Sequence, residues 1–216
     1  MDPRVIYWLV FAVLTALVLF LNVKYGMLRD ESILDKKKPY SFARTQLTWW
    51  TVIVLSGFVT IILKRCEIPT FNQHVLILLG ISSATTVTAR LTDISDKARY
   101  DAEGLSQNFP GQNFMVDILS DNNGVSIHRL QAVVFNIVIG FWFIHQTLAN
   151  MVASPAIGMD NILPDLSPNN LILMGLSAGT YAALKMTENK NTSGNPPDKS
   201  AAKAIEKNET EIPPLA

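Results

Sequence analysis

The sequence has little cysteine and, over long stretches, no charge. Cys66 is the only cysteine in 216 residues, which excludes an internal disulfide. Asp, Glu, Lys and Arg are absent from five apolar runs: residues 5–21, 47–63, 75–89, 130–151 and 171–184. A helix on the surface of a soluble protein needs a polar face, and the first of these runs offers only Thr15 for one. These absences argue against a soluble helical protein and predict an all-α membrane protein.

Missing residue types also argue against several classes of function. No Asp, Glu, Lys or Arg lies at the centre of a predicted span, which argues against a proton-coupled pump or transporter. His74, His128 and His145 are far apart in the predicted topology, and the acids in 117–124 lack the spacing of a calcium loop, so we expect no metal site. No nucleophile–base pair, phosphate-binding loop or nucleic-acid-binding surface is recognisable in the sequence. We therefore predict no enzyme activity, no cofactor and no nucleic-acid partner.

The lengths of the apolar runs predict five transmembrane helices. Runs 5–21 and 130–151 satisfy the lower limit of about 17 residues for crossing a bilayer core. The two shortest runs are each followed by a cation, Arg90 and Lys185, whose long side chain can reach the headgroups and extend the span. The first run is too long for a signal-peptide core and no small-x-small cleavage site follows it, so we expect it to be retained.

The chain contains two similar copies of a helical hairpin. Residues 41–46 and 126–131 share the pattern S-x-x-R-x-Q, and residues 76–85 and 171–180 share G-[IL]-S-[SA]-x-T. Each copy holds two spans, so both copies start on the same side of the membrane. We therefore expect parallel repeats, related by a pseudo-twofold axis along the membrane normal.

These features divide the chain into six segments. They are an N-terminal span (1–24), a cytoplasmic linker (25–39), hairpin repeat 1 (40–93), a cytoplasmic loop (94–124), hairpin repeat 2 (125–188) and a tail (189–216). In the loop, Phe114, Met115, Ile118 and Leu119 have helical spacing and predict a short amphipathic helix at 113–120 that lies at the membrane interface or docks on a partner. A turn built on Asn-Gly follows it. The tail is rich in Asn, Lys, Glu and Pro, which predicts disorder.

The distribution of Lys and Arg predicts the orientation. With five spans, fifteen of the eighteen Lys and Arg residues fall on one side of the membrane. The other side holds only Arg4, Lys64 and Arg65, and the loop 152–170 has no positive charge. Because cytoplasmic loops carry the excess of Lys and Arg, we expect the N-terminus outside and the C-terminus in the cytoplasm.

Most of the polar residues that the two repeats share are expected to lie together at the cytoplasmic face. Ser41 and Ser126 have the position of helix N-caps, and Arg44 and Arg129 follow three residues later. The arginines either reach the headgroups and fix the helices, or pair with acids of this face, or bind anionic lipid or a ligand. The predicted cluster comprises Ser41, Arg44, Gln46, Arg90, Asp93, Asp117, Asp121, Ser126, Arg129, Gln131, Lys185 and Glu188. The acids available to the arginines are either Asp93 and Glu188 or Asp117 and Asp121.

The third and fifth predicted spans carry small and polar residues at every fourth position. Small residues in this spacing let helices approach closely, whereas hydroxyl groups in the same spacing either hydrogen-bond between helices or line a pore. The sequence leaves both possibilities open. The residues of this stripe are Gly80, Ser82, Ala84, Thr86, Gly175, Ser177, Gly179 and Tyr181.

Three strings of the sequence carry a resemblance to a known group of proteins. Residues 40–46 with Trp49 and Trp50, residues 117–131 and residues 174–181 are similar to bacterial multi-pass membrane proteins to which no activity is attached. The resemblance covers roughly residues 40–185. It implies a bacterial inner membrane.

The polar residues at one face lead to a functional hypothesis. We expect a non-enzymatic membrane subunit that forms homo-oligomers in the lipid bilayer and presents residues 92–125 and the tail to a cytosolic protein partner. The alternative is an ion channel or pore-forming effector lined by the third and fifth spans.

Overall fold

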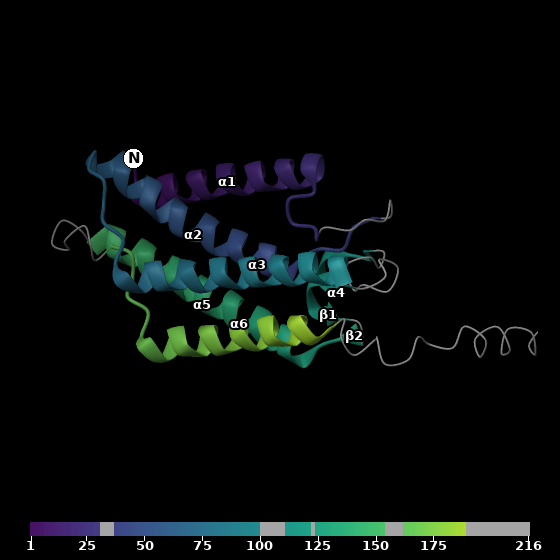
Figure 1. Cartoon of the computed structure of the whole chain (residues 1–216). Helices are drawn as coiled ribbons and strands as arrows, with labels where there is room; N and C mark the ends of the chain where they lie inside the picture. Colours follow the sequence, from purple (N-terminus) through teal and green to yellow (C-terminus); the bar gives the residue numbers. More distant parts are fainter. Residues whose placement is uncertain (31–36, 100–110, 122–123, 154–161, 189–216) are drawn as a thin grey trace, which may run out of the picture.

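A computed structural model describes residues 1–30, 37–99, 111–121, 124–153 and 162–188, and these form a bundle of long helices (Figure 1). The predicted disordered tail, 189–216, lies outside the described residues. The helices are α1 (Pro3–Tyr25), α2 (Phe42–Arg65), α3 (Gln73–Arg99), α4 (Phe114–Leu119), α5 (Ile127–Ala153) and α6 (Pro168–Glu188). Two short antiparallel strands, β1 (Ser120–Asp121) and β2 (Gly124–Val125), lie between α4 and α5.

Local sequence signals set where α1 begins and ends. Asp2 accepts a hydrogen bond from the Arg4 amide at 2.9 Å, and Pro3 occupies the first helical position, where its missing N–H costs nothing. Gly26 ends the helix with a φ of 65° and donates its amide to the Asn22 carbonyl. Glycine adopts this left-handed conformation at little cost, so the chain can turn sharply into the linker.

Helix α2 lies at the centre of the bundle. It packs against α1, α3 and α5, and α6 lies beside α3 and α5. Two tryptophans of α2 anchor it to α5: the Trp50 indole N–H donates to Asn136 Oδ1 at 2.7 Å, and the Trp49 indole N–H donates to the Asn136 carbonyl at 3.0 Å. Gly140 makes room for this contact, because a Cβ there would lie 2.6 Å from Trp49 Nε1.

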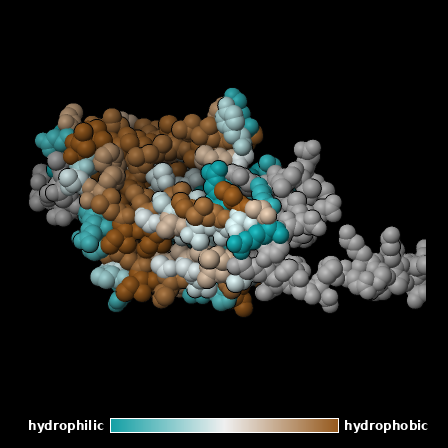
Figure 2. Space-filling view, viewed as in Figure 1, coloured by the Kyte–Doolittle hydropathy of each residue, from teal (hydrophilic) through white to brown (hydrophobic). Residues whose placement is uncertain are grey.

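Four helices of the described chain, α1, α2, α3 and α5, are long and apolar enough to cross a membrane. Their outward faces form a largely apolar surface (Figure 2), and only 6% of the most apolar stretch of α1 is buried inside the protein. These findings agree with a membrane protein. The fifth predicted span corresponds to α6, which has 21 residues but is not among the four. Asn169, Asn170 and Lys185 near its ends explain its lower hydropathy.

The predicted twofold relation between the hairpins does not describe how the helices are arranged. A twofold axis that exchanges the hairpins would place α3 beside α5 and α2 beside α6. The main contacts instead pair α2 with α5 and α3 with α6, so the hairpins lie side by side. In this arrangement, the side of the first hairpin that contacts the second hairpin does not correspond to the side of the second hairpin that contacts the first. Matched residues therefore have different surroundings: Gln46 is buried while its counterpart Gln131 is exposed.

Candidate functional site

One end of the bundle gathers most of the polar residues that the sequence singled out. Here α1, α3 and α6 end and α2 and α5 begin, and α4 and the two strands cover the same end (Figure 1). We call it the basic end, after Arg44, Arg129 and Lys185, which lie here. The described members of the predicted polar cluster lie at this end. The side chains of Asp121 and Glu188 lie outside the described residues.

A buried lysine forms the centre of this end. Lys185 Nζ lies 3.1 Å from Asp93 Oδ1 and 3.5 Å from Asp30 Oδ2. The side chain of Lys185 is 5% exposed, that of Asp93 8% and that of Asp30 14%. Asp30 belongs to the α1–α2 connection, Asp93 to α3 and Lys185 to α6. The lysine thus fastens the connection to two helices. Arg90, its counterpart in the repeat, is exposed.

Asp30 is the member of this cluster that the sequence analysis missed. Burial alone would raise the pKa of Asp30, but Lys185, a hydrogen bond from the Ser41 hydroxyl, and the charges of Arg44 and Arg129 together lower it below 3.8. Asp30 is therefore a carboxylate at neutral pH, surrounded by cations. No sequence signal separates Asp30 from Glu31 or Asp35 of the same linker, because none of them recurs in the second repeat.

The prediction of a side-chain cap at Ser41 is wrong, although Ser41 occupies the N-cap position of α2. Its side chain makes no capping hydrogen bond and bonds to Asp30 instead. A buried carboxylate needs donors more than a helix end does, since charged acceptors make the stronger hydrogen bonds. At the start of the second repeat, Ser126 directly precedes α5 and its amide donates to the Leu119 carbonyl at 2.9 Å.

The two arginines of the repeats lie close to this centre in different ways. Arg44 donates to the Met27 carbonyl at 3.5 Å, across the α1–α2 connection. Arg129 donates to the Ser120 carbonyl and places its guanidinium 5.3 Å from the centre of the Tyr181 ring. Both contribute to the field that lowers the pKa of Asp30. The arginines therefore act on a carboxylate that was not among their predicted partners.

Asp117 fixes the short helix α4 rather than pairing with an arginine in the contacts described. Its carboxylate accepts the amide of Tyr40 at 3.2 Å and that of Gln112 at 2.9 Å. Tyr40 and Phe114 also meet edge to face, with ring centres 5.3 Å apart. The predicted amphipathic helix thus packs on its own chain, where Ile118 is 4% exposed, while Met115 remains 62% exposed.

Most small residues of the α3–α6 stripe lie outside the contact between these two helices within one chain. Gly80, Ala84 and Gly179 are exposed, and a Cβ at Gly80 or Gly179 would meet nothing within 4 Å. At Gly175 it would meet only Ile81, at 3.8 Å. Gly80, Ala84 and Gly179 therefore face away from the α3–α6 contact within one chain, whereas Gly175 lies beside α3.

The polar members of the stripe take part in packing instead. Ser82 is fully buried and donates to the Leu78 carbonyl at 3.2 Å, and Thr86 donates to the Ala43 carbonyl at 3.2 Å. Tyr181 is 2% exposed and meets Phe42 edge to face, while Ser177 is half-buried. Gln46, from the predicted cluster, is 4% exposed, and its Oε1 has no hydrogen-bond partner among the described residues.

We call this arrangement the Lys185 clamp. Lys185 pairs with Asp30 and Asp93, and the charges of Arg44 and Arg129 also favour the carboxylate form of Asp30. Across the described ranges, no group of three His, Cys, Asp or Glu side chains could hold a metal ion.

The lowered pKa of Asp30 predicts an acid-dependent stability. Because the folded-state pKa lies below 3.8, the contribution of Asp30 is present above that pH and is lost as the pH falls through the folded-state value. Thermal unfolding in detergent should show a steeper loss of Tm below about pH 4 for the wild type than for Asp30→Asn. Glu67→Gln, which alters an exposed acid at the opposite end, should keep the wild-type slope; equal slopes for all three proteins would contradict the assignment.

Comparisons of the chain with protein-family models, curated proteins and solved structures find no match. The resemblance to bacterial multi-pass membrane proteins therefore stays an expectation from the sequence.

Proposed function

We propose that the protein is a non-enzymatic subunit of a bacterial inner membrane, with its basic end in the cytoplasm, where it binds a cytosolic protein. The observation that carries this proposal is the fixed construction of the basic end. The Lys185 clamp holds the α1–α2 connection against α3 and α6, and Asp117 holds α4 against that connection. Buried ion pairs of this kind favour one defined arrangement of the segments they join.

Apolar side chains are exposed on the surface of the basic end. Met115 of α4 is 62% exposed, Val125 of β2 68% and Ile127 at the start of α5 78%. Exposed apolar groups on an ordered surface are typical of sites that bind another protein. We infer that a cytosolic partner covers them, and that copies of the chain meet in the bilayer through the exposed stripes of α3 and α6, where Gly80 and Gly179 permit close approach.

Capture of proteins from native membranes by the full chain tests this proposal. Ile127→Gln should reduce the amount of a captured soluble protein severalfold, because it removes an apolar contact from the proposed surface. Ile68→Gln is a matched control, since Ile68 is also 78% exposed but lies at the opposite end of the bundle. Capture of this chain alone, or equal loss with both variants, would contradict the proposal.

The channel alternative receives less support from the packing. Ser82 and Tyr181 would have to face water in a path between α3 and α6, yet both are buried. We therefore expect planar bilayers containing the purified oligomer to stay silent. A conductance that Ser82→Leu abolishes without unfolding the protein would favour the channel instead.

A further inference from the structure

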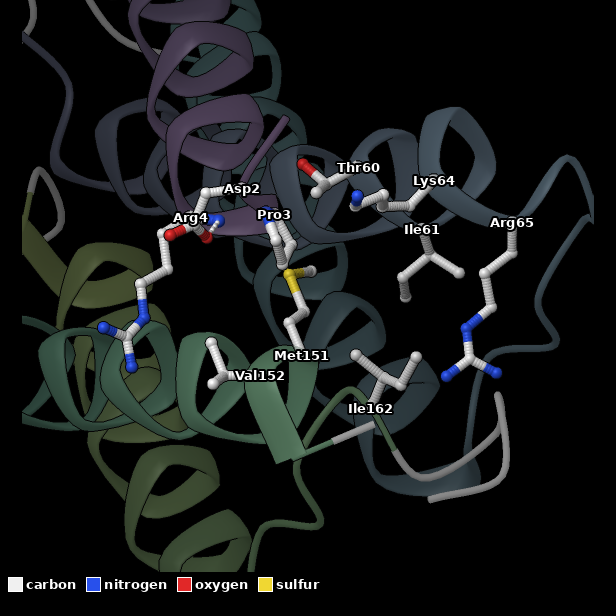
Figure 3. A pocket seen from close by; sticks show the side chains of 10 residues that line it. All are labelled: Asp2, Pro3, Arg4, Thr60, Ile61, Lys64, Arg65, Met151, Val152 and Ile162. Atoms are coloured by element: carbon white, nitrogen blue, oxygen red, sulfur yellow. Dashed lines mark hydrogen bonds between the residues drawn. The ribbon is translucent and has the colours of Figure 1, made fainter. Parts of the chain in front are cut away.

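A pocket of about 590 Å³ opens at the end of the bundle opposite the basic end. The start of α1, the end of α2 and the end of α5 surround it, and Ile162 closes one side (Figure 3). Its lining includes Arg4, Lys64 and Arg65. In the figure, the two arginines lie on either side of the pocket and Lys64 lies between them.

These three residues are the only Lys and Arg residues at this end. The chain has no Lys or Arg between residues 66 and 89, or between 130 and 184. An end with so few cations has no general need to place all of them around one cavity. Their convergence therefore requires its own explanation.

Helix electrostatics explain only two of the three positions. Lys64 and Arg65 lie in the last turn of α2, where the partial negative charge of the helix end favours cations. Arg4 lies in the first turn of α1, where the partial positive charge of the helix disfavours a cation. Asp2 offsets this in part, but its carboxylate already accepts the Arg4 amide as the helix cap. An anion bound in the pocket would stabilise Arg4 and the start of α1 together.

The cationic side chains are available for such an anion. Among the described residues, the side chains of Arg4, Lys64 and Arg65 form no ion pair and donate no hydrogen bond. Among the described residues that line the pocket, Asp2 is the only acid. The remaining lining is largely apolar, with Ile61, Met151, Val152 and Ile162.

We propose that this pocket binds a phosphate-bearing anion, held by Arg4, Lys64 and Arg65. Arginine and lysine both bind phosphate oxygens strongly through charge-assisted hydrogen bonds. The end of a membrane-spanning bundle lies at the level of lipid headgroups, and the apolar part of the lining suits the glycerol and upper acyl chain of a lipid. A phosphate carried on a lipid is therefore the favoured source, and free phosphate is the other.

Retention of lipid by the purified full chain tests this site. The protein is exchanged into detergent with equal amounts of phosphatidylglycerol and phosphatidylcholine, and the bound lipid is counted by native mass spectrometry. The wild type should retain phosphatidylglycerol selectively, and each of Arg4→Gln, Lys64→Gln and Arg65→Gln should weaken retention about fivefold. Lys24→Gln, which removes a basic residue from the last turn of α1 at the basic end, is the control and should retain lipid like the wild type.

A second arm separates the two sources of phosphate. The triple variant combines Arg4→Gln, Lys64→Gln and Arg65→Gln. If the ligand is a free anion, millimolar inorganic phosphate added without lipid should raise the Tm of the wild type but not that of the triple variant. Selective retention of lipid without this rise in Tm assigns the site to a lipid. The gel-filtration profile and circular dichroism establish that each variant is folded. Equal retention by the wild type and the folded triple variant, with no effect of phosphate on either, would overturn the proposal, as would an equal loss with Lys24→Gln.

Discussion

Replacing Lys185 by Met is expected to lower the free energy of unfolding by about 3–5 kcal/mol, the range for breaking a buried ion pair by removing one partner. Lys185 is 5% exposed and lies within 3.5 Å of both Asp30 and Asp93. Without the ammonium group, two carboxylates remain in a confined space and repel each other. The loss is measured by unfolding the purified protein in mixed micelles with increasing dodecyl sulfate.

The repeat itself supplies the control for this substitution. Arg90 occupies the position of Lys185 in the first hairpin but is exposed, so Arg90→Met should cost about 1 kcal/mol or less. Adding Asp93→Asn to Lys185→Met should recover part of the lost stability, because it removes the repulsion between the two carboxylates that Lys185 holds together. A similar loss for Lys185→Met and Arg90→Met, or no recovery in the double variant, would show that Lys185 is not the centre of the cluster.

The contrast between Lys185 and Arg90 shows why the sequence predicted only part of this site. Matching the two hairpins identified Arg44, Asp93, Arg129 and Lys185 as residues that share one end of the molecule, and the structure brings these together. Matching the hairpins could not tell whether Lys185 or Arg90 is buried, because burial depends on the side that each hairpin presents to the other. Asp30 escaped altogether, since it belongs to a linker without a counterpart in the repeat.

The fold was predictable to a similar degree and for related reasons. Long runs without charge predicted the helices, because a helix satisfies its backbone hydrogen bonds within one segment inside a bilayer core and needs about 20 apolar residues to cross it. The twofold relation failed because similarity between two hairpins carries no information on how they are placed. The role of the small-residue stripe stayed open for the same reason: a spacing of four residues defines a helix face, but it does not say what covers that face.

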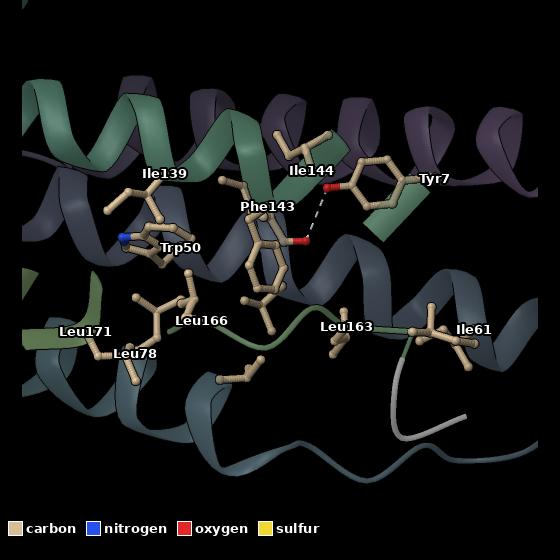
Figure 4. Close-up of a cluster of buried hydrophobic side chains, with 14 of the residues drawn as sticks. Tyr7, Trp50, Ile61, Leu78, Ile139, Phe143, Ile144, Leu163, Leu166 and Leu171 are labelled. Atoms are coloured by element: carbon tan, nitrogen blue, oxygen red, sulfur yellow. Dashed lines mark hydrogen bonds between the residues drawn. The ribbon is translucent and has the colours of Figure 1, made fainter. Parts of the chain in front are cut away.

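The second large effect is expected at Trp50, a fully buried side chain of α2 (Figure 4). Trp50→Ala should cost about 3–5 kcal/mol in the free energy of unfolding, the usual range for truncating a buried aromatic residue. The substitution empties the space against Phe143, whose ring centre lies 6.1 Å from that of Trp50. It also leaves Asn136 Oδ1 without the indole N–H that it accepts at 2.7 Å.

Two further variants at tryptophan positions separate these contributions. Trp50→Phe keeps an aromatic ring beside Phe143 but removes the N–H, so it should cost about 1–2 kcal/mol, the value of an interhelical hydrogen bond in model membrane helices. Trp8→Ala is the matched control, because Trp8 is 47% exposed on the outer face of α1 and its removal leaves no closed cavity. Unfolding in mixed micelles should therefore rank the variants Trp50→Ala, Trp50→Phe and Trp8→Ala in decreasing order of loss. A loss at Trp8 as large as that at Trp50 would place the stability of the bundle at the α1 surface. The predicted order would locate it where α2 and α5 meet, at the contacts of Trp50 with Asn136 and Phe143.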